Sequence, residues 1–313
     1  MSGYLTKFFT ILLFLLFLLF PADVFQGACN GLLLWFNSVL PTLLPFIILS
    51  DLLIRTHAVV WIVRVTGPLL KTIFRVSDYG SFAIVIGFLC GYPMGSKVIA
   101  DLRRENHISH KEGQYLLSFC NNASPIFIIS YIVLQNFRDE RLLLPAILIL
   151  LSAPVLSSFL FRRAYGSAAH ENGKIPSPPS FAVSSNPSAN LVDSCIMDGF
   201  ENITKVGGYI MLFSIFLSLA QKIPCSGILF TCIFLPSLEI TNGVALLCQS
   251  ALPVPMSFLF CMACVSFGGL CAAAQTKCMT EGTGLSIGDY IAKKLVTAMV
   301  TSLLCLFYLK FLY

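Results

Sequence analysis

Two adjacent asparagines stand directly before an expected helix start in the middle of this chain. Asn121 and Asn122 precede Ser124 and Pro125, and an apolar run follows them to about residue 137. Serine at the N-cap and proline at the first helical position are typical of a helix start. The free backbone N–H groups and the helix dipole at such an end favour an anionic or polar ligand. Capping does not readily account for both asparagines, so we predict that this segment binds a ligand.

Four further polar residues lie within or beside apolar runs. Glu239 has no cation in its apolar run over residues 228–247, so within the membrane it needs a partner, a proton or a cavity. Alternatively, this part of the run is a loop in which Glu239 is solvated. Lys97 and Asp101 are four apart and share a helical face, either in a polar site or as an ion pair at the membrane interface. Gln275 can bond a ligand or a neighbouring helix.

The sequence lacks the arrangements typical of an enzyme. No serine or cysteine stands beside a histidine in a nucleophile motif, and neither paired carboxylates nor a metal-ligand spacing is present. Cys264, Cys271 and Cys278 recur every seven residues, and Cys261 precedes the first of them by three, but no histidine lies near. Small side chains at this spacing favour close helix packing over metal ligation or disulfides. We expect no catalysis, no cofactor and no metal site.

The composition indicates that these residues lie in a membrane. Of the 313 residues, 57% are hydrophobic and 11% are charged, whereas about a quarter are charged in an average soluble protein. The net charge is +5, but the 20 lysines and arginines are scattered between apolar runs and form no basic stripe. This distribution favours a topological use of the cations and argues against nucleic acid as a partner. We predict an all-α polytopic membrane protein.

Two long apolar stretches, one in each half of the chain, are interrupted by glycines. The stretch over residues 81–100 is broken at Gly91 to Lys97, and the stretch over 256–276 is broken at Gly268 to Leu270. Interrupted hydrophobic segments that recur in both halves indicate a binding site near the middle of the membrane. Unwound backbone at that depth persists only where protein or a polar cavity surrounds it.

The remaining apolar runs predict the other membrane elements. We expect an uncleaved first helix, then a second span kinked by Pro41 and Pro45, and then a basic amphipathic stretch at the interface. A capping box at Ser109 and Glu112 predicts a helix that ends near Cys120. The first three elements cover residues 8–20, 31–54 and 57–76, and the later spans cover 142–161, 207–220, 228–247 and 290–311.

The two halves resemble repeats. Gly91 and Gly268 lie 177 positions apart, and Leu69–Leu70 and Leu246–Leu247 keep that offset. A polar stretch from Tyr165 to Asp193, rich in Ser, Pro, Asn and Gly, predicts a linker between the halves. The basic loops can all be cytoplasmic if the first broken segment is a re-entrant hairpin; if it crosses fully, one of them lies outside. We predict two inverted repeats whose broken or re-entrant helices meet around a polar site.

Four motifs, taken in order, carry a resemblance to a known family. The motifs are Gly91 to Lys97, Leu116 to Ile128, Leu238 to Gly243, and Ser266 to Leu270 with Gln275. They resemble the YlbJ family of sporulation integral membrane proteins over nearly the whole chain, and that family carries a nucleoside-recognition or Gate domain.

The resemblance implies a multi-pass protein of a bacterial cell membrane, in the forespore or the mother cell. Its implied role is in endospore formation, through assembly of the spore cortex. The expected division is an N-terminal transmembrane helix at 1–28, Gate-like membrane repeats at 29–163 and 196–313, and a polar linker at 164–195.

We expect a transporter or sensor of a small solute, and the alternative is a non-transporting scaffold that recruits sporulation partners. The expected partners are the lipid bilayer, a small solute or ion, and a second copy of the chain or other sporulation membrane proteins. The expected substrate-binding residues are Gly91, Tyr92, Pro93, Gly95, Lys97, Asn121, Asn122, Ser124, Glu239, Thr241, Gly268, Gly269 and Gln275.

Overall fold

The computed structural model describes residues 2–56, 58–165, 191–225 and 227–311, and the regular elements in these ranges are helices. Five of the described helices are long and apolar enough to cross a membrane, or six if a bent pair counts as one span. Large apolar side chains such as Phe8, Phe25 and Met299 are exposed on the outer surface. Such a surface suits lipid rather than water. The chain is a polytopic all-α membrane protein, as its composition predicted.

The first half contains two long helical stretches with two interrupted segments between them. Its elements are α1 (Ser2–Leu19), α2 (Pro21–Leu34), η1 (Trp35–Val39), α3 (Leu40–Arg55), α4 (Val59–Phe74), α5 (Asp78–Cys90), α6 (Met94–Arg104), α7 (His110–Phe119), η2 (Phe127–Phe137), η3 (Glu140–Leu142) and α8 (Leu143–Tyr165).

The second half has the same plan in fewer elements. They are α9 (Leu191–Ala220), η5 (Phe230–Phe234), α10 (Leu235–Leu238), α11 (Ile240–Gln249), α12 (Val254–Phe267), α13 (Gly269–Met279) and α14 (Ile287–Phe311).

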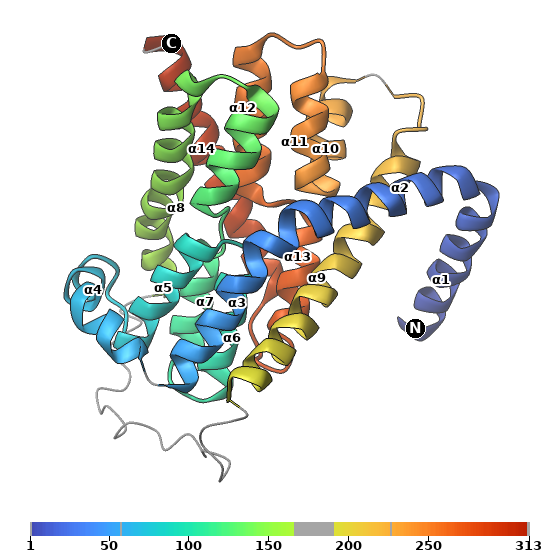
Figure 1. The fold of residues 1–313 in the computed structure, drawn as a ribbon. Coiled ribbons are helices and arrows are strands. Elements are labelled where there is room, and N and C mark those ends of the chain that lie inside the picture. Colours follow the sequence, from blue (N-terminus) through green and yellow to red (C-terminus); the bar gives the residue numbers. More distant parts are fainter. Residues whose placement is uncertain (1, 57, 166–190, 226, 312–313) are drawn as a thin grey trace.

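The order of elements repeats between the halves, but with a different alignment from the predicted one. Each half consists of a long helix, an interrupted hairpin, a second interrupted segment and a final span. In the first half these are α2–α3, α5–α6, α7–η2 and α8. In the second half they are α9, α10–α11, α12–α13 and α14. Figure 1 shows α5 and α6 at the lower end of the molecule and α10 and α11 at the upper end. In this order Glu239 corresponds to Gly91, and Gly268 corresponds to the asparagine pair. The 177-residue offset is therefore not the repeat spacing.

The first broken segment folds back on itself. Helices α5 and α6 pack against each other on either side of the turn at Gly91, which is the hairpin alternative. In the second half the apolar run over residues 228–247 is also interrupted, at Glu239, where the sequence predicted a continuous span or a loop. The breaks at Gly91, Asn121, Glu239 and Gly268 therefore give each half two interruptions at corresponding places in the order of elements.

Helices α2 and α9 lie directly against each other, as Figure 1 shows. Gly27 and Gly31 are four apart on α2, and a Cβ on either would lie 2.8 Å from a backbone Cα atom of α9. Small residues at this spacing let membrane helices approach closely. The predicted span over residues 31–54 covers the end of α2 together with η1 and α3, which follow α2 without a gap. The π-helical turn η1 lies immediately before Pro41, where the missing N–H of proline interrupts the regular hydrogen-bond ladder.

Two of the predicted helix starts are present, one of them with a different partner. Ser109 Oγ accepts from the Glu112 N–H at 3.1 Å, and α7 ends at Phe119 as expected. The Glu112 carboxylate, however, accepts from the Ser77 N–H at 2.6 Å, so it caps the start of α5 and not its own helix. Ser124 Oγ accepts from the Phe127 N–H at 3.3 Å, which confirms the second predicted start.

Several predicted boundaries differ from the helices or lie outside the described residues. Most of the polar linker falls on residues 166–190, which lie outside the described ranges. The span expected from residue 207 is the second part of α9, which begins at Leu191. The expected interfacial stretch contains α4. The part of α4 from Gly67 to Phe74 is bent by 96° relative to α5. The domain boundaries at residues 28 and 195 fall inside α2 and α9, and the division stays a prediction.

Candidate functional site

The four helix interruptions meet near the centre of the fold. The first two interruptions are joined by a backbone hydrogen bond. The Tyr92 N–H, next to Gly91, donates to the carbonyl oxygen of Asn122 with an N···O distance of 2.6 Å. The Tyr92 ring also lies 3.7 Å from the place that a Cβ of Gly268 would take. A Cβ on Gly269 would lie 3.0 Å from the carbonyl oxygen of Ser237, beside the interruption at Glu239. The breaks of both halves therefore form one continuous region.

Left-handed backbone at two glycines allows this close meeting. Gly91 has a φ of 83° and Gly268 a φ of 88°, a region that residues with a Cβ rarely adopt. A Cβ at Gly91 would in addition lie 2.8 Å from the backbone nitrogen of Ser124. The peptide bond between Tyr92 and Pro93 is cis. The positive φ at Gly91 ends α5 and turns the chain into α6 next to the second interruption.

Glu239 is buried at the start of α11, with 2% of its surface exposed. Its Oε1 accepts from the Thr241 N–H at 3.1 Å, and its Oε2 accepts from the Asn242 N–H at 2.8 Å and from Asn242 Nδ2 at 3.0 Å. The carboxylate thus caps the helix, whose free N–H groups and dipole stabilise a negative charge at this end. The solvated alternative is wrong, because the chain breaks at Glu239 while its side chain stays buried.

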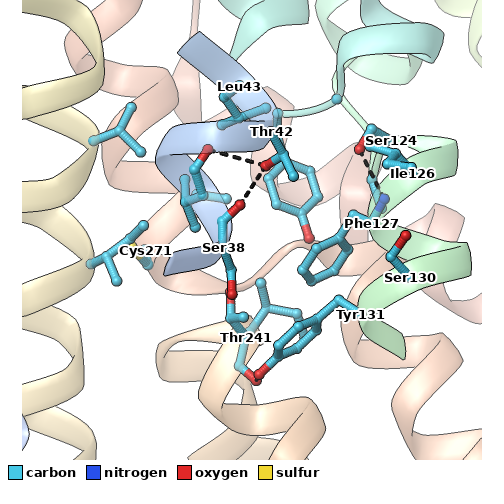
Figure 2. Close-up of a pocket in the computed structure, with 18 of the residues that line it drawn as sticks. Ser38, Thr42, Leu43, Ser124, Ile126, Phe127, Ser130, Tyr131, Thr241 and Cys271 are labelled. Atoms are coloured by element: carbon cyan, nitrogen blue, oxygen red, sulfur yellow. Dashed lines mark hydrogen bonds between the residues drawn. The ribbon is translucent and has the colours of Figure 1, made fainter. Parts of the chain in front are cut away.

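A cavity of about 230 Å³ lies beside these interruptions. Figure 2 shows Ser38 and Thr42 on one wall, Ser124, Phe127 and Ser130 on the facing wall, and Thr241 below them. These walls come from the α2–α3 helix, from the start of η2 and from α11. Polar residues supply part of the lining, namely Asn37, Ser38, Thr42, Tyr92, Ser124, Ser130, Tyr131, Gln135, Glu239, Thr241 and Gln275.

The cavity reaches the surface between η1 and η2. Asn37 on η1 and Ser130 and Gln135 on η2 line it and are themselves exposed. All three lie on helices whose other exposed side chains are mostly apolar, such as Phe36 and Leu134. Polar side chains on an otherwise apolar, lipid-facing surface are costly unless they face a cavity or another polar group. They therefore mark the mouth of the cavity.

Some polar groups of the lining have incomplete hydrogen bonding. The Tyr92 hydroxyl is buried and has no hydrogen-bond partner among the described residues. Gln275 Nε2 contacts the thiol of Cys271 at 3.3 Å, and sulfur is a weak acceptor. The Tyr131 hydroxyl, in contrast, donates to the Thr241 carbonyl oxygen at 2.9 Å. A buried polar group without a partner costs about 1–3 kcal/mol, so a ligand that bonds the Tyr92 hydroxyl recovers that cost.

The two asparagines lie behind the cavity and not in its wall. Asn121 Nδ2 donates to Thr276 Oγ1 at 2.9 Å and to the Tyr290 hydroxyl at 3.0 Å. Lys294 on α14 is 1% exposed, and its Nζ donates to the Asn121 carbonyl oxygen and to Asn122 Oδ1, both at 3.1 Å. This network ties the second interruption to α13 and α14. Lys294 was not predicted, although an ionisable residue within an apolar run is the same signal that selected Glu239.

Lys97 belongs to an ion-pair cluster at one end of the fold. Its Nζ lies 2.8 Å from Asp51 Oδ1 and 3.1 Å from Asp101 Oδ2, and 12% of its side chain is exposed. The pairing with Asp101 is therefore present, and Asp51 on α3 is a partner that sequence spacing could not reveal. Arg104 also bonds Asp101, at 2.9 Å, and donates to the Met279 carbonyl oxygen at 2.7 Å, which joins α6 to the end of α13.

The structure divides the predicted site residues into two groups. Those that line the cavity are Gly91, Tyr92, Ser124, Glu239, Thr241 and Gln275. Those that pack behind it or at its edge are Pro93, Gly95, Lys97, Asn121, Asn122, Gly268 and Gly269. Their assignment to substrate binding stays a prediction.

The cysteines are unpaired thiols, and the cluster on α12 and α13 is mostly buried. Cys261, Cys264 and Cys271 are at most 4% exposed and pack between helices, as their spacing predicted. Among the described residues, no group of three or more His, Cys, Asp or Glu side chains is placed to hold a metal ion.

Comparison with known proteins identifies a relative along the whole chain. The chain is 27% identical to the sporulation integral membrane protein YlbJ of Bacillus subtilis, over 99% of this chain and 85% of the relative. Neither a family model nor a solved structure matches it. The similarity confirms the resemblance to the YlbJ family that the motifs indicated, and a Gate domain stays a prediction.

Proposed function

We propose that this chain, as a relative of YlbJ, is an integral membrane protein of sporulation that binds a small solute in the cavity between its interrupted helices. In this proposal the protein moves the solute across the membrane or senses it. By the same resemblance, we assign the role to endospore formation, at the assembly of the spore cortex.

One observation carries this proposal: interrupted helices from both halves meet beside a cavity that contains a buried carboxylate. Breaking a helix within the membrane frees backbone groups, each of which costs several kcal/mol unless it finds a partner. Continuous helices would pack without this cost. Four interruptions beside one cavity, with Glu239 at a helix end in its wall, are what a midmembrane binding site requires.

The repeated order of elements, with the α5–α6 and α10–α11 hairpins at opposite ends of the molecule, supports movement around this site. In transporters built from inverted repeats, one repeat rocks against the other around a fixed site. Here the cavity takes its walls from both halves, since Ser124 belongs to the first and Glu239 to the second. A shift of one half against the other would therefore change access to the cavity without dismantling either wall.

The test is ligand-dependent stability of the detergent-purified protein. Thermal unfolding is measured with nucleosides, amino acids, dipicolinate, sodium ions and changes of pH. The same panel is applied to a Gln275→Met variant, which removes a polar group from the lining, and to a Thr301→Val variant. Thr301 is buried on α14 and bonds Ser266, and it is a matched control because it does not line the cavity.

Binding to the folded state alone stabilises by about 2.7 kcal/mol at a hundredfold excess over the dissociation constant. We expect at least one solute to raise the unfolding temperature of the wild type and of Thr301→Val, and to have a smaller effect on Gln275→Met. A flat response of the folded protein, together with normal sporulation of cells that carry Gln275→Met, would contradict solute binding and leave the scaffold as the better account.

A further inference from the structure

The charge and hydrogen-bonding pattern of the cavity select a class of solute. We propose that it binds a small organic cation, a protonated amine on a compact apolar or aromatic body. This inference rests on the proposed function, because it concerns the same cavity, and it adds the charge and shape of the solute.

The first argument is charge. Among the described residues that line the cavity, Glu239 has a side chain that is negative when ionised, and no lysine, arginine or histidine is present. The nearby buried cation, Lys294, donates to Asn121 and Asn122, neither of which lines the cavity. A buried anion beside Glu239 would be repelled without compensation, whereas an ammonium group would be paired.

The second argument is the supply of hydrogen-bond acceptors. A carboxylate has about four lone-pair positions, and Glu239 accepts three bonds, all from the first residues of its own helix. Gln275 contributes its amide nitrogen to a weak contact with a thiol. The Tyr92 hydroxyl is buried without a partner and can accept a bond. An ammonium group brings three donors and no acceptor, which suits a wall with spare acceptors.

The third argument is the apolar part of the lining. The rings of Phe127 and Tyr131 stack at 5.2 Å between centroids, and the remaining wall includes Leu43 and Ile210. Aromatic faces attract cations, and the attraction is stronger when both are desolvated. A volume of about 230 Å³ accommodates a body of one aromatic ring or a short alkyl chain. A larger polar solute would leave these apolar surfaces against polar groups.

The test compares solutes of one shape and three charges. One set is 2-phenylethylammonium, 2-phenylethanol and phenylacetate, and a second is butylammonium, butanol and butanoate. Dissociation constants are measured from thermal unfolding of the purified protein in one detergent. Because apolar solutes also enter micelles, each measurement is repeated on Glu239→Gln and Glu239→Asp in the same detergent. Asp keeps both the charge and a good capping group, whereas Gln keeps a capping oxygen without the charge.

We expect the ammonium member of at least one set to bind about tenfold more tightly than its alcohol, and the carboxylate to bind most weakly. In Glu239→Gln the preference for the ammonium should disappear, and in Glu239→Asp it should persist. Tyr92→Phe should weaken the ammonium a few fold. The wild-type comparison decides the charge class even if Glu239→Gln does not yield folded protein.

Two results would overturn the inference in distinguishable ways. If an alcohol or a carboxylate binds as tightly as its ammonium counterpart, the cavity binds solutes but not selectively cations, and the proposed function stands. If neither these sets nor the broader panel of solutes stabilises the folded protein, the cation inference and the proposed function both fail.

Discussion

Alanine at Gly95 should push α6 away from the second interruption. A Cβ on this residue would lie 2.2 Å from the carbonyl oxygen of Cys120 and 3.0 Å from its carbonyl carbon. Ordinary contact begins at 3.4 Å, so the two segments must separate by roughly 1 Å in a close-packed region. The obstructing atom is buried backbone and cannot rotate away as a side chain could. Overpacking of this kind costs about 1–3 kcal/mol, and the higher helix propensity of alanine returns about 1 kcal/mol at most.

We therefore expect Gly95→Ala to lower the free energy of unfolding by up to about 2 kcal/mol. The matched control is Gly208→Ala, because a Cβ at Gly208 in α9 meets no atom within 4 Å. That variant should be unchanged or more stable by up to about 1 kcal/mol. Both proteins are unfolded by denaturant in the same detergent and compared with the wild type. If Gly95→Ala proves as stable as Gly208→Ala, the close approach of α6 to the second interruption is wrong.

Three further substitutions test the buried polar contacts. Lys294→Met leaves two buried acceptors without a donor, among them Asn122 Oδ1, and should cost about 1–3 kcal/mol in denaturant unfolding. Lys294→Gln keeps a donor and should cost less. A Met variant as stable as the wild type would refute the role of the ammonium. Asp51→Asn should cost about 1–2 kcal/mol, because Lys97 keeps Asp101 as its second carboxylate partner. This is less than the cost of about 3–5 kcal/mol for a buried charge left without any partner. A loss above about 2 kcal/mol in the same assay would show that Asp101 does not compensate. Arg104→Gln removes bonds to two carbonyl groups, one on the last residue of α13 and one just after it. Because the Arg104 side chain is 43% exposed, the cost should be about 1 kcal/mol, and protease cleavage after α13 should become faster than in the wild type.

Local patterns in the sequence were enough for the class of protein and for most of the places where helices begin and break. The excess of apolar residues requires a helical membrane protein, because backbone groups in lipid must bond within their own segment. Gly91 and Gly268 end their helices, and Ser109 and Ser124 start theirs, as predicted. Each of these features depends on residues a few positions apart, whose bonds are set by the local backbone.

The roles of the predicted polar residues needed the tertiary structure. Glu112 caps α5 instead of its own helix, and Asn121 and Asn122 hold Lys294 instead of facing the cavity. The third interruption, at Glu239, was assigned to a loop or a continuous span until the packing of α10 and α11 showed a buried helix cap.

The alignment of the repeats was likewise decided by element order and not by matching glycines. Any two apolar helices share small residues at similar spacings, so a constant offset between Gly91 and Gly268 does not identify equivalent positions. The sequence by itself determined that the chain is helical, lies in a membrane and is interrupted at particular residues. The structure decided which interruptions meet and which polar groups face the cavity. Some tertiary contacts in this chain join residues 177 positions apart, and such pairs meet only through the packing of several helices at once.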